Sequence, residues 1–221
     1  MPIHRSPEPA LTGANSPRGF EAILLAAGAG SRFGGDKLLA DFQGRPLLEA
    51  ALDCARRAPI ARLILVTPPS GQIREAAERY VRRQSDGPRL EIVCAHDHTE
   101  GMGASLRTGV QALSQGLAGA FVFLGDMPLV PPTILPLLAQ AVSGGARAAC
   151  PVHQGRRGHP VVFEADLFPL LARSSGDAGA RALLAELGSD LAMVACDHQG
   201  VLIDIDTHAD LTAAQAFPRS P

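Results

Sequence analysis

The chain has 221 residues, of which 46% are hydrophobic and 19% charged, and its formal net charge at pH 7 is -2. This length suits one well-buried α/β domain better than two small ones, because surface-to-volume scaling favours a single core. Acidic and basic residues are interspersed, so the chain has no overall field that would attract nucleic acid or an anionic membrane. We expect neither as a partner, and an anionic ligand must be held by a local site.

The cysteines and the chain ends exclude further classes. No CxxC spacing and no dense cysteine framework occurs, which disfavours a structural zinc site and fits core residues in a reducing cytoplasm. The four cysteines are Cys54, Cys94, Cys150 and Cys196. No apolar run approaches the roughly 20 residues of a membrane span. Residues 1–19 contain four prolines and lack the apolar middle of a signal peptide. We therefore expect a cytoplasmic protein with a disordered leader over 1–19 and a short tail over 218–221.

From Phe20 onward, short aliphatic runs alternate with helix-like segments, a pattern typical of parallel strands joined by crossover helices. Apolar runs bounded by turn residues predict strands over 20–27, 61–69, 89–95 and 119–128. Helical spacing of apolar residues predicts helices over 46–58, 72–83, 103–113 and 133–142. Ligands of such sheets bind outside the carboxyl ends of the strands. The loops that begin at Gly28, His96 and Asp126 are therefore the candidate binding loops.

The pattern is looser beyond Ala146. The segments 146–153 and 159–163 favour strands, 177–187 favours a helix, and VLIDI over 201–205 favours a final strand before a C-terminal helix. No flexible linker separates this half from the first, so we expect an elaboration of the same sheet rather than a second domain.

The stretch LLAAGAGSRFGGDKLL over 24–39 places glycines and two cations directly behind the first predicted strand. It fails the dinucleotide fingerprint GxGxxG, because Phe33 stands where the third glycine belongs. It also fails the P-loop pattern, since Asp36 replaces the lysine and no Ser or Thr follows Lys37. Glycines allow backbone N–H groups to turn towards an anion, and Arg32 and Lys37 can neutralise a triphosphate. The stretch thus indicates a triphosphate-binding loop of a third kind, and a strand-to-helix turn with two solvated cations is the alternative.

Taken with five further blocks, this loop resembles a known family. The blocks are GMGASLRTG from Gly101, GDMP from Gly125, GHPVVF from Gly158, GDAGAR from Gly176 and DIDTHADL from Asp204. The set is similar to the molybdenum cofactor cytidylyltransferases, a branch of the nucleotidyltransferase superfamily. The resemblance implies a three-layer, Rossmann-like α/β fold with a mostly parallel central sheet. It implies one domain over 20–217, with a nucleotide-binding half (20–145) and a half for acceptor substrate and metal (146–217).

The implied reaction transfers CMP from CTP to the phosphate of molybdenum-molybdopterin and releases pyrophosphate, with Mg²⁺ as cofactor. Such a reaction needs charges that hold and neutralise two anions, and the resemblance implies Arg32, Lys37 and Asp126 as the catalytic residues. Asp126 ends an apolar strand and is the first expected metal ligand, because Mg²⁺ prefers one or two carboxylates beside phosphate oxygens and water. Asp206 is the second expected ligand, with Asp204 as its alternative.

The resemblance also implies the substrate-binding residues. Those expected for the nucleotide are Leu25, Ala26, Ala27, Gly28, Ala29, Gly30, Lys37, Met102, Gly103 and Ser105. The methyl groups of Ala26 and Ala27 would narrow the base pocket in favour of a pyrimidine, unless both alanines simply pack under the first helix. For the acceptor, His159, Asp177 and Arg181 are expected, with an exposed turn histidine and a solvated helix arginine as the alternatives. His96 and His98 are expected to belong to an ordinary polar loop, because no third metal ligand accompanies them.

Two other functions remain open. One is a different cytidylyl or guanylyl transfer to a small phosphorylated substrate. The other is an oxidoreductase or a non-catalytic accessory protein of a molybdenum hydroxylase, with that hydroxylase or its maturation factor as the partner. The failed dinucleotide fingerprint disfavours a nicotinamide site, and the presence of Arg32, Lys37 and Asp126 disfavours a catalytically dead chain.

Overall fold

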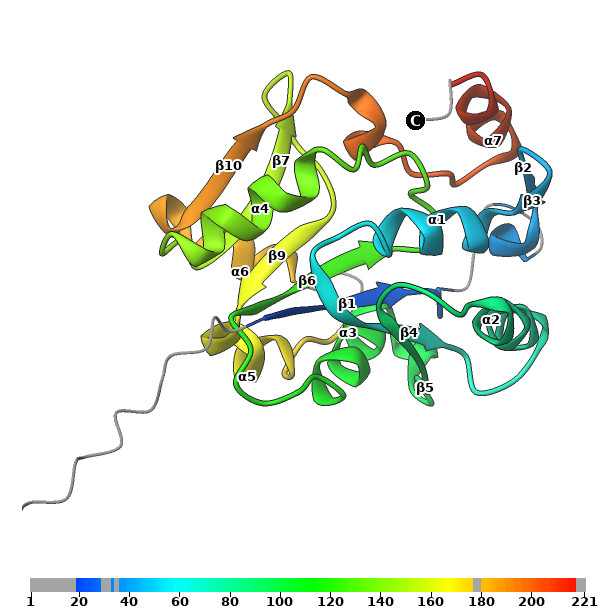
Figure 1. The fold of residues 1–221 in the computed structure, drawn as a ribbon, viewed down its shortest axis with the longest axis horizontal. Coiled ribbons are helices and arrows are strands. Elements are labelled where there is room, and N and C mark those ends of the chain that lie inside the picture. Colours follow the sequence, from blue (N-terminus) through cyan, green and yellow to red (C-terminus); the bar gives the residue numbers. More distant parts are fainter. Residues whose placement is uncertain (1–18, 29–32, 34–35, 177–179, 218–221) are drawn as a thin grey trace, which may run out of the picture.

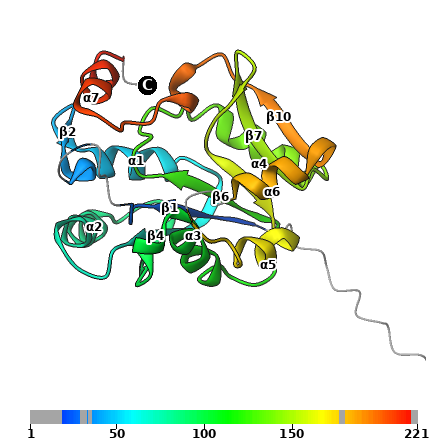
Figure 2. The same ribbon diagram turned by 180° about the vertical axis from the view of Figure 1, so that it is seen from behind.

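The computed structural model describes residues 19–28, 33, 36–176 and 180–217, and in this part of the chain a large sheet carries helices on both faces (Figures 1 and 2). The sheet has eight strands, seven of them in the order β10-β7-β9-β6-β1-β4-β5, with β8 paired to β7. Neighbouring strands are parallel except where β9 pairs with β6 and β7 and where β8 pairs with β7. The expected three-layer α/β fold with a mostly parallel sheet is confirmed.

The elements have the following bounds. The strands of the large sheet are β1 (Phe20–Leu25), β4 (Ile60–Thr67), β5 (Arg89–Cys94), β6 (Gly119–Leu124), β7 (Ala148–His153), β8 (Arg156–Arg157), β9 (Val161–Glu164) and β10 (Leu191–Ala195), and β2 (Asp41–Phe42) pairs with β3 (Arg45–Pro46). The helices are α1 (Leu47–Ala55), α2 (Gln72–Arg83), α3 (Met102–Gln111), α4 (Ile134–Ser143), α5 (Phe168–Leu171), α6 (Arg181–Glu186) and α7 (His208–Gln215). Short 3₁₀ helices are η1 (Lys37–Leu39), η2 (His98–Glu100), η3 (Ala165–Leu167), η4 (Gly188–Asp190) and η5 (Gln199–Leu202).

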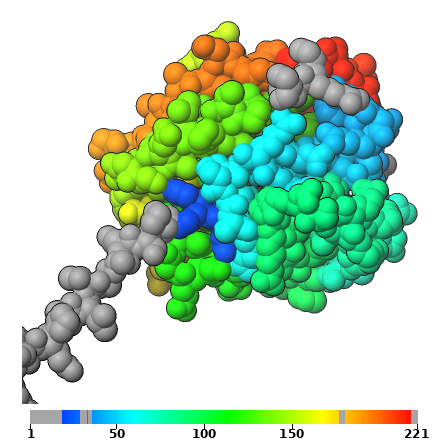
Figure 3. Space-filling view, in the orientation of Figure 1, coloured from blue at the N-terminus to red at the C-terminus, as the bar shows by residue number. Residues whose placement is uncertain are grey.

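Strand β1 lies at the centre of the molecule, and all six of its residues are buried. Because side chains alternate across a strand, Ala22 and Leu24 belong to one core, whereas Ile23 and Leu25 belong to the other. The first core is covered by α1, α2, α4 and α7, and the second by α3, α5 and α6. Figure 3 shows the first face, on which the segments containing α4 (yellow-green), α1 (cyan) and α2 (blue-green) pack side by side. Two covered faces explain why the central strands are continuous aliphatic runs.

The elements expected in the first half of the chain are all present, within a few residues at each end. In the second half, the strand expected over 201–205 is wrong. Gln199–Leu202 forms η5, and the edge strand is instead β10, which the sequence pattern did not predict. Val201 and Ile205 are fully buried, so the apolar run anchors a connection to the core without joining the sheet. Gly200 is needed there, because a Cβ at this position would lie 2.0 Å from the carbonyl oxygen of Leu129.

Some expectations concern residues that the structure does not describe. The leader (apart from Gly19), the tail, Ala29, Gly30, Arg32 and Asp177 all lie outside the described residues. The helix expected over 177–187 is described as α6, Arg181–Glu186. In the described part of the chain, no helix combines the length and the apolar character needed to span a membrane.

Candidate active site

Three segments meet beyond the carboxyl ends of β1 and β6. Gly125 donates its backbone N–H to the carbonyl oxygen of Leu25 at 2.9 Å, and Ile205 donates to the carbonyl oxygen of Asp126 at 3.1 Å. A Cβ on Gly125 would lie 3.0 Å from the Leu25 oxygen, so a small residue suits this approach. These bonds hold the loop after β1, the GDMP turn and the segment before α7 against one another.

Lys37 lies between two carboxylates at this junction. Its Nζ atom is 2.8 Å from Oδ2 of Asp126 and 2.8 Å from Oδ1 of Asp206. The lysine side chain is 11% exposed, and the two carboxylates are 22% and 37% exposed. Burial alone would lower the pKa of Lys37, but the charges and hydrogen bonds of Asp126 and Asp206 outweigh it and raise the pKa above its ordinary value. Lys37 is therefore a firmly charged ammonium group, and three of the residues singled out in the sequence meet at one point.

The donor set at this point fits a hard divalent cation. Asp126 Oδ1 is buried and has no hydrogen-bond partner among the described residues, so one carboxylate oxygen is left for a further ligand. In the described part of the chain, no three metal-ligating side chains cluster together. Two carboxylates without a third protein ligand suit Mg²⁺ or Mn²⁺, which take the remaining ligands from phosphates and water.

The segment before α7 determines which aspartate faces Lys37. Asp204 is exposed, whereas Asp206 contacts the lysine. Helix α7 begins with a capping box between Thr207 and Asp210, and Asp210 Oδ2 also accepts the backbone N–H of Asp206 at 3.2 Å. The geometry thus favours Asp206 over Asp204 as the residue beside Lys37. The capping box also explains why Thr207 and Asp210 of the DIDTHADL block are polar.

A pocket of about 270 Å³ opens beside these charges. It is lined by Leu25, Ala26, Gly28, Lys37, Leu38, His98, Thr99, Gly101, Met102, Ser105, Leu124 and Asp126. One end carries Lys37 and Asp126, and another wall comes from η2 and the start of α3. Seven of the residues singled out in the sequence line this pocket. Among the described lining residues, Lys37 and Asp126 carry the ammonium and carboxylate groups, which suits a ligand with an anionic tail and a flat base.

Two of the residues expected at the nucleotide, Ala27 and Gly103, do not line this pocket. Ala27 is 1% exposed and packs in the core on the α3 side, the face of the sheet opposite to α1, which is the first helix. Gly103 donates its backbone N–H to the carbonyl oxygen of Gly176 at 2.8 Å, and a Cβ there would lie 2.7 Å from the backbone of Ser175. Gly103 therefore allows the segment before residue 177 to pack against the start of α3.

Arg107, one turn further along α3, reinforces this contact. Its guanidinium donates to the carbonyl oxygen of Ser174 at 3.3 Å and forms ion pairs with Glu100 at 3.3 Å and Asp97 at 3.5 Å. The segment that leads to the expected acceptor residues is thus tied to the wall of the pocket.

Among the expected acceptor residues, His159 and Arg181 are described. Gly158 lets the His159 backbone approach Val201, whose carbonyl oxygen accepts the His159 N–H at 2.8 Å. Burial lowers the pKa of His159; the charges of Asp126 and Asp204 oppose the shift, and that of Arg181 adds to it. The imidazole Nδ1 is buried and has no hydrogen-bond partner among the described residues. His159 is thus a neutral ring within electrostatic reach of Asp126, and Arg181 is an exposed residue at the start of α6.

With this geometry in view, comparison with known proteins assigns the family. The family model described as a MobA-like NTP transferase domain matches residues 22–214. The chain belongs to this family. It is therefore a nucleotidyltransferase of the MobA-like type, with a nucleoside triphosphate as one substrate, and the superfamily resemblance drawn from the sequence motifs is confirmed.

Relatives of this MobA-like chain carry several names. Nicotine blue oxidoreductase of Paenarthrobacter nicotinovorans is 32% identical over 193 residues, which cover 84% of this chain and 91% of that protein. The crystal structure of Rv0371c from Mycobacterium tuberculosis H37Rv is similar with a TM-score of 0.73 at 27% identity, covering 90% of this chain and 98% of that one. The same protein has been crystallised in a complex with manganese. Molybdopterin-guanine dinucleotide biosynthesis protein A of Archaeoglobus fulgidus shares the fold, with a TM-score of 0.60 at 19% identity over 88% of this chain and 96% of that one.

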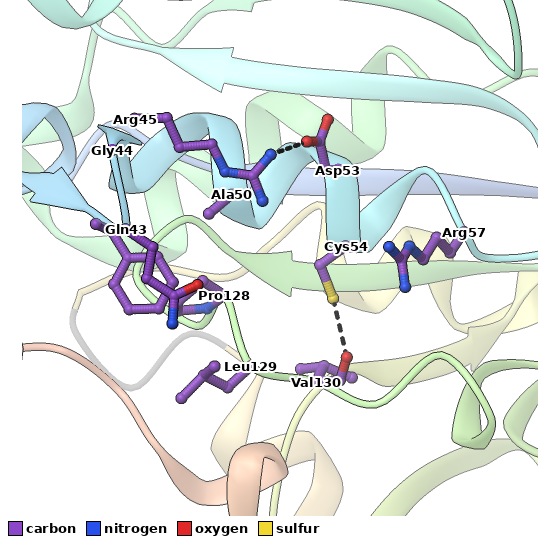
Figure 4. A pocket seen from close by; sticks show the side chains of 11 residues that line it. Gln43, Gly44, Arg45, Ala50, Asp53, Cys54, Arg57, Pro128, Leu129 and Val130 are labelled. Carbon is purple, nitrogen blue, oxygen red and sulfur yellow. Dashed lines mark hydrogen bonds and ion pairs between the residues drawn. The ribbon is translucent and has the colours of Figure 1, made fainter. Parts of the chain in front are cut away.

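The MobA-like chain has a second pocket, of about 470 Å³, on the other side of the GDMP turn (Figure 4). It lies between the β2–β3 hairpin, α1 and residues 128–130. Arg45 pairs with Asp53 across its rim, and Cys54 donates its thiol to the carbonyl oxygen of Val130 at 3.3 Å. Burial raises the pKa of Cys54 to about 12, so this thiol is not a nucleophile. Arg45 and Asp53 are thus paired with each other, and the candidate active site remains the pocket beside Lys37.

Proposed function

We propose that this MobA-like transferase moves CMP from CTP to the terminal phosphate of molybdenum-molybdopterin and releases pyrophosphate. The observation that carries the proposal is the convergence of Lys37, Asp126 and Asp206 beside a pocket that Lys37 and Asp126 line. In the reaction, an oxygen of the acceptor phosphate attacks the α-phosphorus of CTP in line. A P–O bond forms to the acceptor, the bond between the α-phosphorus and the α–β bridging oxygen breaks, and pyrophosphate leaves with that electron pair.

The charged residues would act on the two anions. Lys37, held as an ammonium group, lies where it can neutralise the triphosphate, and we assign Arg32 of the same loop to the phosphates as well. Asp126 and Asp206 would hold Mg²⁺, which when bound stabilises the charge on phosphate oxygens. The crystallised manganese complex of a relative supports a divalent cation in this fold. These residues would position the two anionic substrates and neutralise their charge. Such preorganised charge is the main catalytic contribution available to this site.

The base would lie against Ala26. This residue lines the pocket and is 1% exposed, so its methyl group limits the room at that wall. A narrower pocket favours cytosine over guanine, since a methyl-sized change in a pocket discriminates by about 1 to 3 kcal/mol. The backbone around Gly28, Ala29 and Gly30 would approach the phosphates, and Met102 and Ser105 would complete the wall.

The acceptor phosphate would be received by His159, Asp177 and Arg181. His159 has a buried nitrogen with no partner among the described residues and lies within electrostatic reach of Asp126. Arg181 can pair with a phosphate as a planar fork. The contact between Gly103 and Gly176 brings this segment to the edge of the nucleotide pocket, which supports transfer between two ligands bound side by side.

The test offers purified protein CTP, GTP, ATP or UTP separately, with Mg²⁺ and molybdenum-loaded molybdopterin, and measures pyrophosphate release. We expect CTP to give the fastest release. Faster release with GTP would reject the alanine argument in favour of guanylyl transfer. Release only with a sugar-like alcohol phosphate as acceptor would move the protein to another branch of the family. Absence of release with all four nucleotides would reject the proposal.

A second candidate rests on the name of the Paenarthrobacter relative. That protein is called an oxidoreductase, so the same preparation should be assayed for oxidation of NADH and NADPH. We expect none, because the loop after β1 lacks the spacing of a dinucleotide fingerprint. The described cysteines are free thiols, which suits the cytoplasm, where a molybdenum hydroxylase or its maturation factor would receive the product.

A further inference from the structure

His98 has a place that its sequence context did not indicate. The sequence predicts an ordinary polar loop around His96 and His98, but His98 begins η2 and lines the pocket beside Thr99 and Met102. His96 is exposed and does not line it. Of these two histidines, therefore, only His98 can meet a ligand there.

The protonation pattern of the His98 ring is set by the end of β5. Its Nδ1 lies 3.0 Å from the carbonyl oxygen of Ala95. A carbonyl oxygen only accepts, so Nδ1 carries the proton, and in the neutral ring Nε2 keeps its lone pair. Ala95 itself is fully buried and donates its N–H to the carbonyl oxygen of Thr67 at 2.9 Å. The sheet thus holds the Ala95 carbonyl group in place, and this group determines the tautomer of the neutral His98 ring. Nε2 is then the remaining polar atom of the ring, and it is an acceptor.

The distribution of charge determines which part of a nucleotide meets that acceptor. Lys37 and Asp126 lie at the end of the pocket where a triphosphate and its cation would be held. His98 belongs to the wall that η2 and α3 form, together with Met102 and Ser105. A lone pair would repel phosphate oxygens, whereas a base offers N–H donors at its edge.

We propose that His98 Nε2 accepts a hydrogen bond from the exocyclic amine of the base and thereby selects cytosine against uracil. This inference rests on the proposed use of CTP. Cytosine presents an N4 amine where uracil presents the O4 oxygen, so uracil would place two acceptors against each other. A site that pairs with a donor discriminates against an analogue that lacks it, because the bound analogue would leave His98 Nε2 without a partner.

The experiment measures dissociation constants for CTP and UTP by calorimetry, with Mg²⁺ and without acceptor. We expect wild-type protein to prefer CTP by at least about tenfold. His98→Asn keeps an amide near the Nδ1 position but has nothing at Nε2, and should bring the two constants within about threefold of each other. His98→Gln reaches the Nε2 position with an amide oxygen and should restore the preference. His96→Asn, the matched control on an exposed neighbour, should behave as wild type.

A second comparison changes the ligand and tests the same contact in the wild-type protein. The triphosphate of the 2-pyrimidinone riboside lacks the amine without gaining an oxygen. Wild-type protein should bind it at least about fivefold more weakly than CTP, and His98→Asn should bind the two alike. The inference is overturned if His98→Asn retains the preference for CTP, or if wild-type protein binds UTP or the pyrimidinone as tightly as CTP.

The outcomes for His98 and for the proposed function are separable, because binding is measured without acceptor. If the preference for CTP depends on His98 but nothing is transferred to molybdopterin, this inference holds and the proposed acceptor is rejected. If CMP is transferred to molybdopterin but His98→Asn prefers CTP over UTP as wild type does, the proposed function holds and this inference is rejected.

Discussion

The backbone N–H of Ile205 donates to the carbonyl oxygen of Asp126 at 3.1 Å. This bond joins the GDMP turn of the first half of the chain to the segment before α7 in the second half. Asp206 follows Ile205 directly, so the two carboxylates are brought to the same ammonium group of Lys37. The site therefore depends on the second half of the chain as much as on the glycine loop.

Replacing Lys37 should affect both catalysis and metal response. Lys37→Met removes the only cation that the described contacts place between Asp126 and Asp206. We expect turnover with CTP to fall by at least about a hundredfold, as for other losses of preorganised charge. The two carboxylates then repel each other, so Mn²⁺ should raise the melting temperature of the variant more than that of wild type. Calorimetric melting scans with and without Mn²⁺ measure this rise in both proteins. If Mn²⁺ raised the melting temperature of the variant and of wild type equally, Lys37 and the metal would not share these carboxylates.

Asp206 and Asp204 offer a matched pair for locating the metal. Asp206→Asn should weaken binding of Mn²⁺ in the presence of CTP by at least about tenfold, because the carboxylate beside Lys37 loses its charge. Asp204→Asn changes an exposed carboxylate two residues away and should leave binding within about twofold of wild type. Electron paramagnetic resonance of free Mn²⁺ measures both. The reverse order of effects would make Asp204 the ligand.

Gly103→Ala tests the contact between the nucleotide wall and the acceptor segment. The added Cβ would lie 2.7 Å from the Ser175 backbone, so that segment must shift. We expect the KM for the acceptor to rise by at least about fivefold, with a smaller change in the dissociation constant of CTP. Gly144→Ala on the distant α4 end, where the nearest atom is 3.2 Å away, is the control. Unchanged acceptor KM in folded Gly103→Ala would separate this segment from acceptor binding.

Glu21 should make a pH-dependent contribution to stability. It is 4% exposed and accepts hydrogen bonds from Arg62 at 2.8 and 3.1 Å and from the Ser114 hydroxyl at 2.7 Å. Burial alone would raise the pKa of Glu21, but these bonds outweigh it and lower the pKa below 4.5. The stabilisation is therefore complete above pH 4.5 and is lost as pH falls through the lower pKa of the folded state.

Glu21→Gln should thus cost about 3 kcal/mol in free energy of unfolding at neutral pH, because it leaves the partly buried Arg62 without its closest countercharge. The difference from wild type should shrink below pH 4.5. Urea unfolding of both proteins at several pH values measures it, and a difference that grows on acidification would contradict the assignment.

The sequence predicts the central strands well for a physical reason. Strands β1, β4 and β6 have consecutive buried residues over most of their length, so they stand out as aliphatic runs. The edge strand β10 is also an apolar run, LAMVA, but Val194 is its only β-branched residue, so its composition does not favour a strand over a helix. Its residues are mostly half-buried or exposed, Met193 among them, as expected at a sheet edge. Val201 and Ile205 show the converse, because an apolar run is also needed where a connection crosses the core.

The site is predicted in part. Lys37 could be singled out because it follows a glycine-rich loop, and Asp126 because it ends an apolar strand, whereas Asp206 was indicated by the resemblance of the DIDTHADL block. Their convergence could not be predicted, since it depends on the bond between Ile205 and Asp126, which are far apart in the chain. His98 was missed because nothing in its local sequence indicates the carbonyl group of Ala95 that orients it.

The fate of the α-phosphorus of CTP tests the proposed function most directly. Wild-type protein should receive CTP labelled at the α-phosphate, with Mg²⁺ and molybdenum-loaded molybdopterin, and the products should be separated by chromatography. The account predicts that the label appears in a dinucleotide joined to the pterin phosphate, with one pyrophosphate released for each product formed. Label that remains in CTP, or that appears only as free CMP with no pterin product, would contradict it.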